Sequence, residues 1–202
     1  HALSVSNGRK LRKTSLGRER GMEKVLQEAW TAIERIELDI IIEQIRSLKA
    51  GINKLDTAIA TESEKLAGYR SLVSISGIGS LSAGILLSVI GEVSDFANAD
   101  KLASYFGIVP RAANSNETVH HGRITKHGNK TGRTTLVQCS LAAIKKNDYL
   151  RKYYEQIKAR RGHGKAKIAL ARTYLTIIYS TLTTNRVFAD FNNFKFTEFN
   201  PC

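Results

Sequence analysis

Branched aliphatic residues recur at alternating steps of three and four in the first part of the chain. They are Leu38, Ile41, Ile45, Leu48, Ile52, Leu55, Ile59 and Leu66, and only Glu62 breaks the series. Such spacing places side chains on one stripe of a helix, and filled a and d positions of the heptad are typical of a coiled-coil seam. The pattern predicts a long coiled-coil helix over residues 22–68. It could pack on a second copy of the protein, as a homo-oligomer, or on other helices of the same chain.

The pattern after this helix predicts a compact helical domain over residues 69–187. Helical spacing is expected through residue 90 and then over about 98–106, 134–146, 147–160 and 168–183, whereas the alternation typical of strands is weak. The longest apolar run, 81–90, is far shorter than the roughly 20 residues of a membrane span. The fold class is therefore mostly α, with a basic arm or a truncated linker at 1–21 and an irregular phenylalanine-rich tail at 188–202.

Two glycines, Gly77 and Gly79, separate the first two helical patterns of this domain. A glycine turn followed by a helix start leaves backbone N–H groups uncovered, and these can bind a phosphate. The segment 72–90 thus predicts a helix-hairpin-helix, with Ser80 as the N-cap of its second helix. A tight helix connection without a ligand is the alternative.

The net charge of +13 is concentrated in one block of the sequence. Residues 101–172 contain sixteen basic and three acidic side chains, while the excesses of 1–20 and 21–100 are +5 and −5 and cancel. Such asymmetry favours a polyanion partner, DNA or RNA, over a merely solvated basic face. The candidate DNA-binding residues are Gly77, Gly79, Arg111, Arg123, Lys126, Lys130, Arg133, and, in a glycine-rich hinge at 160–167, Arg160, Arg161, Lys165 and Lys167.

Metal chemistry has little support in this sequence. The carboxylates of the basic block are scattered, and His120, His121, His127 and His163 have no cysteine or acid at zinc spacing. We therefore expect no metal and no cofactor in this chain. The two cysteines are too few for a disulfide framework and no signal peptide opens the chain, so we expect a cytoplasmic protein.

Ser115 is the candidate nucleophile. It lies in a polar, basic segment, 107–133, that we expect to be a loop, with Arg111 before it and Arg123, Lys126 and Arg133 after it. Cations around a serine hydroxyl would stabilise the charge that develops in phosphoryl transfer. A serine that merely caps a turn is the alternative.

Several motifs in fixed order resemble one family. They are S-G-I-G, F-A-N-A-D-K-L-A-S-Y-F-G-I-V-P-R, G-R-I-T-K-H-G-N, R-T-T-L and G-K-A-K-I-A-L-A-R, between about residues 66 and 187. They are similar to the C-terminal transposase domain of the insertion-sequence one-hundred-and-ten family, the bridge-RNA-guided serine recombinases. Ser76 and Thr125 depart from the family pattern, which often has proline and serine there.

The resemblance implies a serine-dependent DNA transposase or recombinase in which Ser115, shortly after the Pro110-Arg111 pair, is the nucleophile. It also implies a guide RNA, and Mg²⁺ bound by a RuvC-like domain that precedes this one. The chain begins at His1 and its only methionine is Met22. We therefore expect a piece of a longer protein, inactive in recombination by itself. The alternatives are a non-catalytic helix-hairpin-helix module and a coiled-coil subunit that binds an acidic protein.

Overall fold

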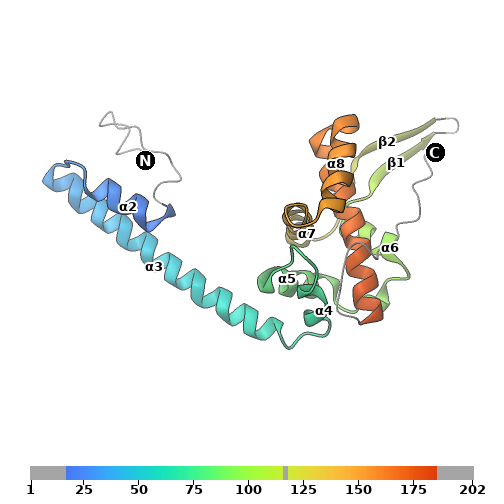
Figure 1. Ribbon diagram of the computed structural model, residues 1–202, viewed down its shortest axis with the longest axis horizontal. Coiled ribbons are helices and arrows are strands. Elements are labelled where there is room, and N and C mark those ends of the chain that lie inside the picture. Colours follow the sequence, from blue (N-terminus) through green and yellow to red (C-terminus); the bar gives the residue numbers. More distant parts are fainter. Residues whose placement is uncertain (1–16, 116–117, 186–202) are drawn as a thin grey trace. The chain divides into compact units, whose positions relative to one another are not determined.

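The computed structural model describes residues 17–115 and 118–185, with the backbone alone over 111–115 and 118–123. Its elements are α2 (Glu19–Leu26), α3 (Ala32–Ser63), α4 (Tyr69–Val73), α5 (Ser80–Ile90), the 3-10 helix η2 (Val93–Asp95), α6 (Ala99–Tyr105), β1 (Pro110–Ser115), β2 (Thr118–Ile124), α7 (Lys130–Ala143) and α8 (Asp148–Thr184) (Figure 1). The mostly α prediction is confirmed. None of the helices in these two ranges is long and apolar enough to cross a bilayer.

Residue contacts divide the chain into two compact units, 1–57 and 58–202, and each is described by itself. In the first unit α2 runs back along the beginning of α3 (Figure 1). Arg46 forms an ion pair with Glu19 at 3.0 Å across these two helices. Met22 and Val25 of α2 and Leu38 and Ile42 of α3 are the buried hydrophobic residues there.

The expected single helix over 22–68 is interrupted at 27–31. The backbone N–H of Thr31 donates to the carboxylate of Glu34 at 2.9 Å, and the N–H of Glu34 points back to the Thr31 hydroxyl at 3.4 Å. This is a capping box, which satisfies the first orphan N–H groups of a new helix. The prediction was therefore wrong about continuity, and α3 starts at Ala32 and ends at Ser63 rather than near residue 68.

The heptad stripe of α3 is largely exposed. Leu48, Ile52 and Leu55 retain 68%, 55% and 64% of their accessible surface. The stripe is covered at Leu38, which is 5% exposed, and partly covered at Ile45. A row of large aliphatic side chains in solvent is unfavourable by about 25 cal/mol for each Å².

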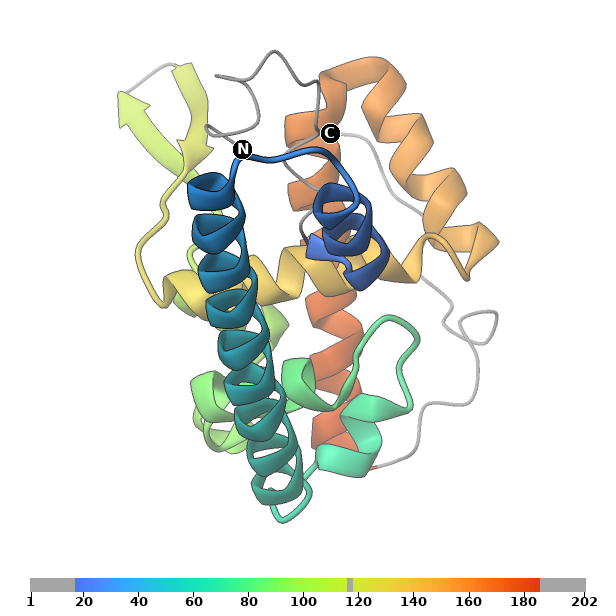
Figure 2. The same ribbon diagram turned by 90° about the vertical axis from the view of Figure 1, so that its left-hand side faces the viewer.

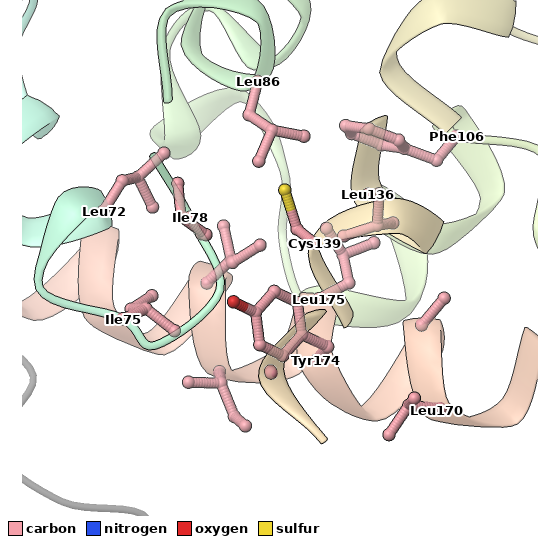
Figure 3. Close-up of a cluster of buried hydrophobic side chains, with 14 of the residues drawn as sticks. Leu72, Ile75, Ile78, Leu86, Phe106, Leu136, Cys139, Leu170, Tyr174 and Leu175 are labelled. Carbon is pink, nitrogen blue, oxygen red and sulfur yellow. The ribbon is translucent and has the colours of Figure 1, made fainter. Parts of the chain in front are cut away.

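The core of the second unit is built around the C-terminal half of α8. Its residues Leu170, Tyr174 and Leu175 meet Leu136 and Cys139 of α7 in the cluster of Figure 3, and all five are at most 3% exposed. The hydroxyl of Tyr174 donates to the backbone carbonyl of Ser76 at 2.7 Å, so this buried tyrosine also fixes the turn before α5. Burial raises the pKa of Tyr174 well above its ordinary value, as expected for a phenol kept neutral in a core.

Asparagine is the N-cap residue of three helices of this unit. The side chains of Asn98, Asn129 and Asn147 accept N–H groups from the first turns of α6, α7 and α8 at 2.9 to 3.0 Å. An asparagine N-cap stabilises a helix by roughly 1 kcal/mol. Asn129 explains why α7 begins at Lys130, four residues before the start expected from apolar spacing.

The segment expected to be a loop at 107–133 contains an antiparallel hairpin. In the register of β1 and β2, Ser115 pairs with Thr118, Ala113 with His120 and Pro110 with Ile124, with an irregularity next to Pro110. The loop prediction was wrong, because the backbone N–H and C=O groups of these two segments pair with each other in a strand ladder. The residues of β1, P-R-A-A-N-S, include few with β propensity, so the strand left no clear trace in the sequence.

Candidate nucleic-acid interface

At the root of the hairpin, two glycines each pack closely against the backbone of a neighbouring segment. Gly107 and Gly128 have φ of 67° and 110°, in the left-handed region that favours glycine. A Cβ on Gly107 would overlap the carbonyl oxygen of His127, and a Cβ on Gly128 would overlap that of Tyr105. The end of α6 and the turn after β2 therefore approach more closely than any side chain would allow.

Lys126 lies in this turn with a φ of 56°, which is unusual for a residue other than glycine. Its N–H donates to the carbonyl of Gly107 at 3.1 Å. Its own carbonyl accepts the Arg133 guanidinium at 3.3 Å, so the backbone of Lys126 is fixed from both sides while its side chain remains exposed. Residues held in sparsely populated backbone regions cluster at functional sites.

Arg133 has a structural contact that its basic character alone did not reveal. Its guanidinium is half-buried and also donates to the carbonyl of Phe106 at 3.2 Å. One cation thus ties the end of α6, the turn at Lys126 and the first turn of α7 together. A contact of Arg133 with DNA stays a prediction.

Ser115 is the last residue of β1, next to the connection between the two strands. The side chains of Ser115, Arg111 and Arg123 lie outside the described residues, so the grouping of these cations around the serine hydroxyl stays a prediction. The backbone alone shows that this serine ends a strand, and that close backbone packing fixes the root of this strand.

Two other residue types with nucleophilic chemistry are buried instead. Cys139 is 3% exposed, and burial raises the pKa of its thiol above the ordinary value, partly offset by a hydrogen bond with Ser82. Tyr174 is fully buried. A buried thiol or phenol with a raised pKa is a poor nucleophile, since its anion is disfavoured.

The expected glycine-rich hinge at 160–167 is confirmed at a single residue. Gly162 has φ 79° and ψ 164°, and α8 is two helical segments joined there (Figure 2). The hydroxyl of Tyr154 is hydrogen-bonded to Nδ1 of His163 across the kink. Arg160, Arg161 and Lys165 are exposed beside it, and Lys167 is half-buried.

The fold brings three of the sequence-predicted cations to one hollow. Lys126 from the hairpin root and Arg161 and Lys165 from the kink line it together with Arg172 of α8. Arg172 was not among the predicted residues, although it lies seven positions after Lys165, and i, i+7 residues share a helix face. Lys130, Arg160 and Lys167 do not line the hollow.

Most of these cations lack a carboxylate neighbour. In the ranges 17–110 and 124–185 no salt bridge involves Lys126, Lys130, Arg160, Arg161, Lys165 or Lys167. Uncompensated positive charge near a rigid root makes a surface suited to phosphates.

The glycine turn before α5 differs from the sequence expectation in one respect. Gly79, not Ser80, is the N-cap of α5, and no side chain caps this helix start. Gly77 has φ 101°, and a Cβ there would overlap the carbonyl of Cys139 in α7. Gly77 is therefore required by packing, and only Gly79 leaves the helix start open. Phosphate binding by either glycine stays a prediction.

No group of three or more His, Cys, Asp or Glu side chains that could hold a metal ion occurs in the part of the chain the structure describes. His163 is engaged with Tyr154, and the side chains of His120 and His121 lie outside that part.

Comparison with known proteins shows which family this part of the chain resembles. Residues 69–155 match the family model described as transposase IS116/IS110/IS902 family. The chain is 30% identical over 146 residues to the insertion element IS110 uncharacterized 43.6 kDa protein of Streptomyces coelicolor, covering 72% of this chain and 34% of that protein. It is 31% identical over 176 residues to the pilin gene-inverting protein of Moraxella lacunata, covering 82% of this chain and 53% of the relative.

A further relative is the transposase for insertion sequence element IS1111A of Coxiella burnetii, 32% identical over 120 residues, which are 57% of this chain and 33% of that protein. The chain thus spans about a third to a half of the length of these curated relatives. The matched region contains α4 to α7, the hairpin and the beginning of α8. At residues 69–155 this chain therefore contains a transposase domain of the IS116/IS110/IS902 family.

Proposed function

We propose that this chain is the part of a DNA transposase or recombinase that binds DNA and supplies a serine nucleophile for strand cleavage and rejoining. One relative is named a transposase and another a gene-inverting protein, and both names describe rearrangement of DNA. The observation that carries the proposal is the group of uncompensated cations around the root of the hairpin whose first strand, β1, ends at Ser115.

The chemical step is a phosphoryl transfer. The Ser115 Oγ attacks a DNA phosphorus, an Oγ–P bond forms, and the bond from phosphorus to the leaving sugar oxygen breaks. The serine proton ends on that oxygen. Because the phosphoserine ester keeps the phosphoryl group, attack by a sugar hydroxyl reverses the step and rejoins a strand. Lysine and arginine side chains stabilise the negative charge of the transition state.

Two parts of the proposal lie outside this chain. Recombination would need Mg²⁺ bound by a RuvC-like domain of the longer protein, as the family resemblance implies. A guide RNA would be the second polyanion on the basic surface.

We expect DNA affinity to fall steeply with salt, by about a thousandfold between 50 and 200 mM if six phosphates are contacted, because neutralised phosphates release counterions. Replacing Lys130 and Arg160 by glutamine should make the plot of log K against log salt shallower, reducing the magnitude of its negative slope by about 2. Fluorescence anisotropy with a labelled duplex measures both quantities.

The control variant replaces Lys24 and Lys54 by glutamine. Both are exposed residues of the first unit and the change in net charge is the same. Its slope should equal that of the unmodified chain. Equal slopes for all three proteins would remove Lys130 and Arg160 from the interface.

We also propose that the exposed stripe of α3 pairs with a second copy of the protein. Leu48, Ile52 and Leu55 repeat at coiled-coil spacing and are more than half exposed. Replacing Leu48 and Leu55 by aspartate should convert an oligomer to a monomer at equal concentration, because the charges would be buried in the seam. Light scattering after size exclusion measures the mass.

Aspartates at Gln44 and Asn53, which are exposed and off the stripe, are the matched control and should leave the oligomer intact. An unchanged mass for the Leu48 and Leu55 variant would show that the stripe does not pair copies of this chain.

A second candidate function is a non-catalytic helix-hairpin-helix module. The uncapped start of α5 at Gly79 favours it, because its free N–H groups suit a phosphate. Such a module binds DNA without forming a covalent adduct, so trapping of an adduct with the full-length protein distinguishes the two candidates.

A further inference from the structure

We propose that the hollow between the hairpin root and the kink of α8 seats the base of one unpaired DNA nucleotide, with the adjacent phosphates on the surrounding cations. The proposal rests on the DNA-binding function proposed above and adds a specific subsite to it.

The hollow is large enough for a single ring system, and part of its lining is apolar. Its volume is about 380 Å³, near the lower end of the roughly 300–1,000 Å³ found for small-ligand sites. Ile124, Ile168, Pro110 and Ala169 contribute partly exposed apolar surface to its lining, and the fully buried Ile108 lies against it. A base pair inside a duplex cannot enter such a space, but an extruded base can place its apolar faces there.

Four cationic residues line the same hollow as these apolar residues. Lys126, Arg161 and Lys165 have no carboxylate partner among the described residues, and Arg172 pairs with Asp100 at 3.2 Å on the exposed surface. A nucleotide in a strand has an apolar base between two phosphates, and the hollow presents the complementary arrangement. The positive charges that line the hollow would not contribute to the binding of an uncharged hydrophobic ligand.

The lining elements are held in place before any ligand binds. Ile108 is fully buried. Lys126 is fixed through its N–H and its carbonyl, and the N–H of Thr125 donates to the carbonyl of Val109 at 3.0 Å. A site on a fixed backbone spends less conformational entropy on binding.

The position of the hollow favours DNA of the cleaved strand as the occupant. Pro110, in its wall, begins β1, and Ser115 ends the same strand. Five residues of strand span about 17 Å, or roughly five nucleotides at the 3.4 Å rise of stacked DNA. On the proposed function, a strand attacked by Ser115 would therefore pass the hollow a few nucleotides from the scissile phosphate.

The test compares three 20-mers under equal salt: oligodeoxyuridine, the fully abasic oligomer with the same phosphates, and oligouridine RNA. Gly164 lines the hollow, and a Cβ there meets nothing within 4 Å. Gly164→Leu therefore fills the hollow without a backbone clash. Ala159→Leu, at an exposed position of α8 that does not line it, is the control. Ala169→Leu is a second filling variant, and circular dichroism checks that each variant is folded.

We expect the unmodified chain to bind oligodeoxyuridine about fivefold more tightly than the abasic oligomer, the lower range for seating one base. Gly164→Leu and Ala169→Leu should abolish this difference and leave the abasic affinity unchanged, while Ala159→Leu keeps it. Equal binding of the base-containing and abasic DNA by the unmodified chain would overturn the base seat but not the proposed DNA binding.

Persistence of the preference in both filled variants would also overturn the proposal, because the base would then be seated elsewhere. Tighter binding of oligouridine than of oligodeoxyuridine would replace DNA by RNA as the occupant and overturn it as stated. Failure of the chain to bind any of the three oligomers would overturn the proposed function itself.

Discussion

Ser115→Ala in the full-length protein should eliminate the covalent protein–DNA adduct and leave DNA affinity within about twofold. The substitution removes the only oxygen of that side chain that can form the ester, and loss of a nucleophile costs on the order of a thousandfold or more in rate. Binding persists because phosphate contacts come from the cations. Denaturing electrophoresis of the protein with a labelled suicide DNA substrate measures the adduct.

Ser104→Ala is the matched control, because Ser104 is an exposed serine of the same unit whose hydroxyl donates to the backbone carbonyl of Asp100 in its own helix. This variant should form the adduct at the normal rate. An adduct that survives Ser115→Ala would end the assignment of the nucleophile. Loss of binding together with the adduct would point to a structural role for Ser115 at the end of β1.

Gly128→Ala should destabilise the second unit by about 3 kcal/mol or more. The new Cβ would overlap the carbonyl oxygen of Tyr105, and φ at this position is 110°, which an alanine adopts only with strain. For a chain of this size such a change lowers the melting temperature by roughly 6–12 °C. Differential scanning calorimetry measures it.

Gly164→Ala is the corresponding control. No atom lies within 4 Å of a Cβ at Gly164, and its φ is outside the left-handed region. Because alanine is a better helix former than glycine, this variant should be unchanged or more stable by up to about 1 kcal/mol. A Gly128→Ala protein that melts with the unmodified chain would contradict the close packing of the hairpin root.

Parts of the structure were readable in the sequence but were missed. The Thr31 and Glu34 pair has the spacing of a capping box, which marks the break before α3. Asn129, four residues before Arg133, likewise marked the start of α7. In both cases the helix start predicted from apolar spacing differs from the start that the capping residue marks. Boundaries depend on such caps more than on the hydrophobic stripe.

Other parts had no local signal. The strands β1 and β2 pair with each other through their backbones, and the side chains of β1 barely favour a strand. The role of Arg133 depends on the carbonyls of Phe106 and Lys126, which come within reach only when α6, the turn and α7 are assembled. Arg172 joins Lys126 at one hollow for the same reason.

The sequence by itself determined the helical class, the order of the helices, a hinge within 160–167, the basic block and the family of the transposase domain. These follow from spacing, glycine chemistry and motif order, which are local along the chain. Only the tertiary structure decided which cations meet, which glycines are required by close approach, and which heptad residues remain exposed. Those properties depend on contacts between distant segments, and a spacing rule along one helix contains no information about what packs against it.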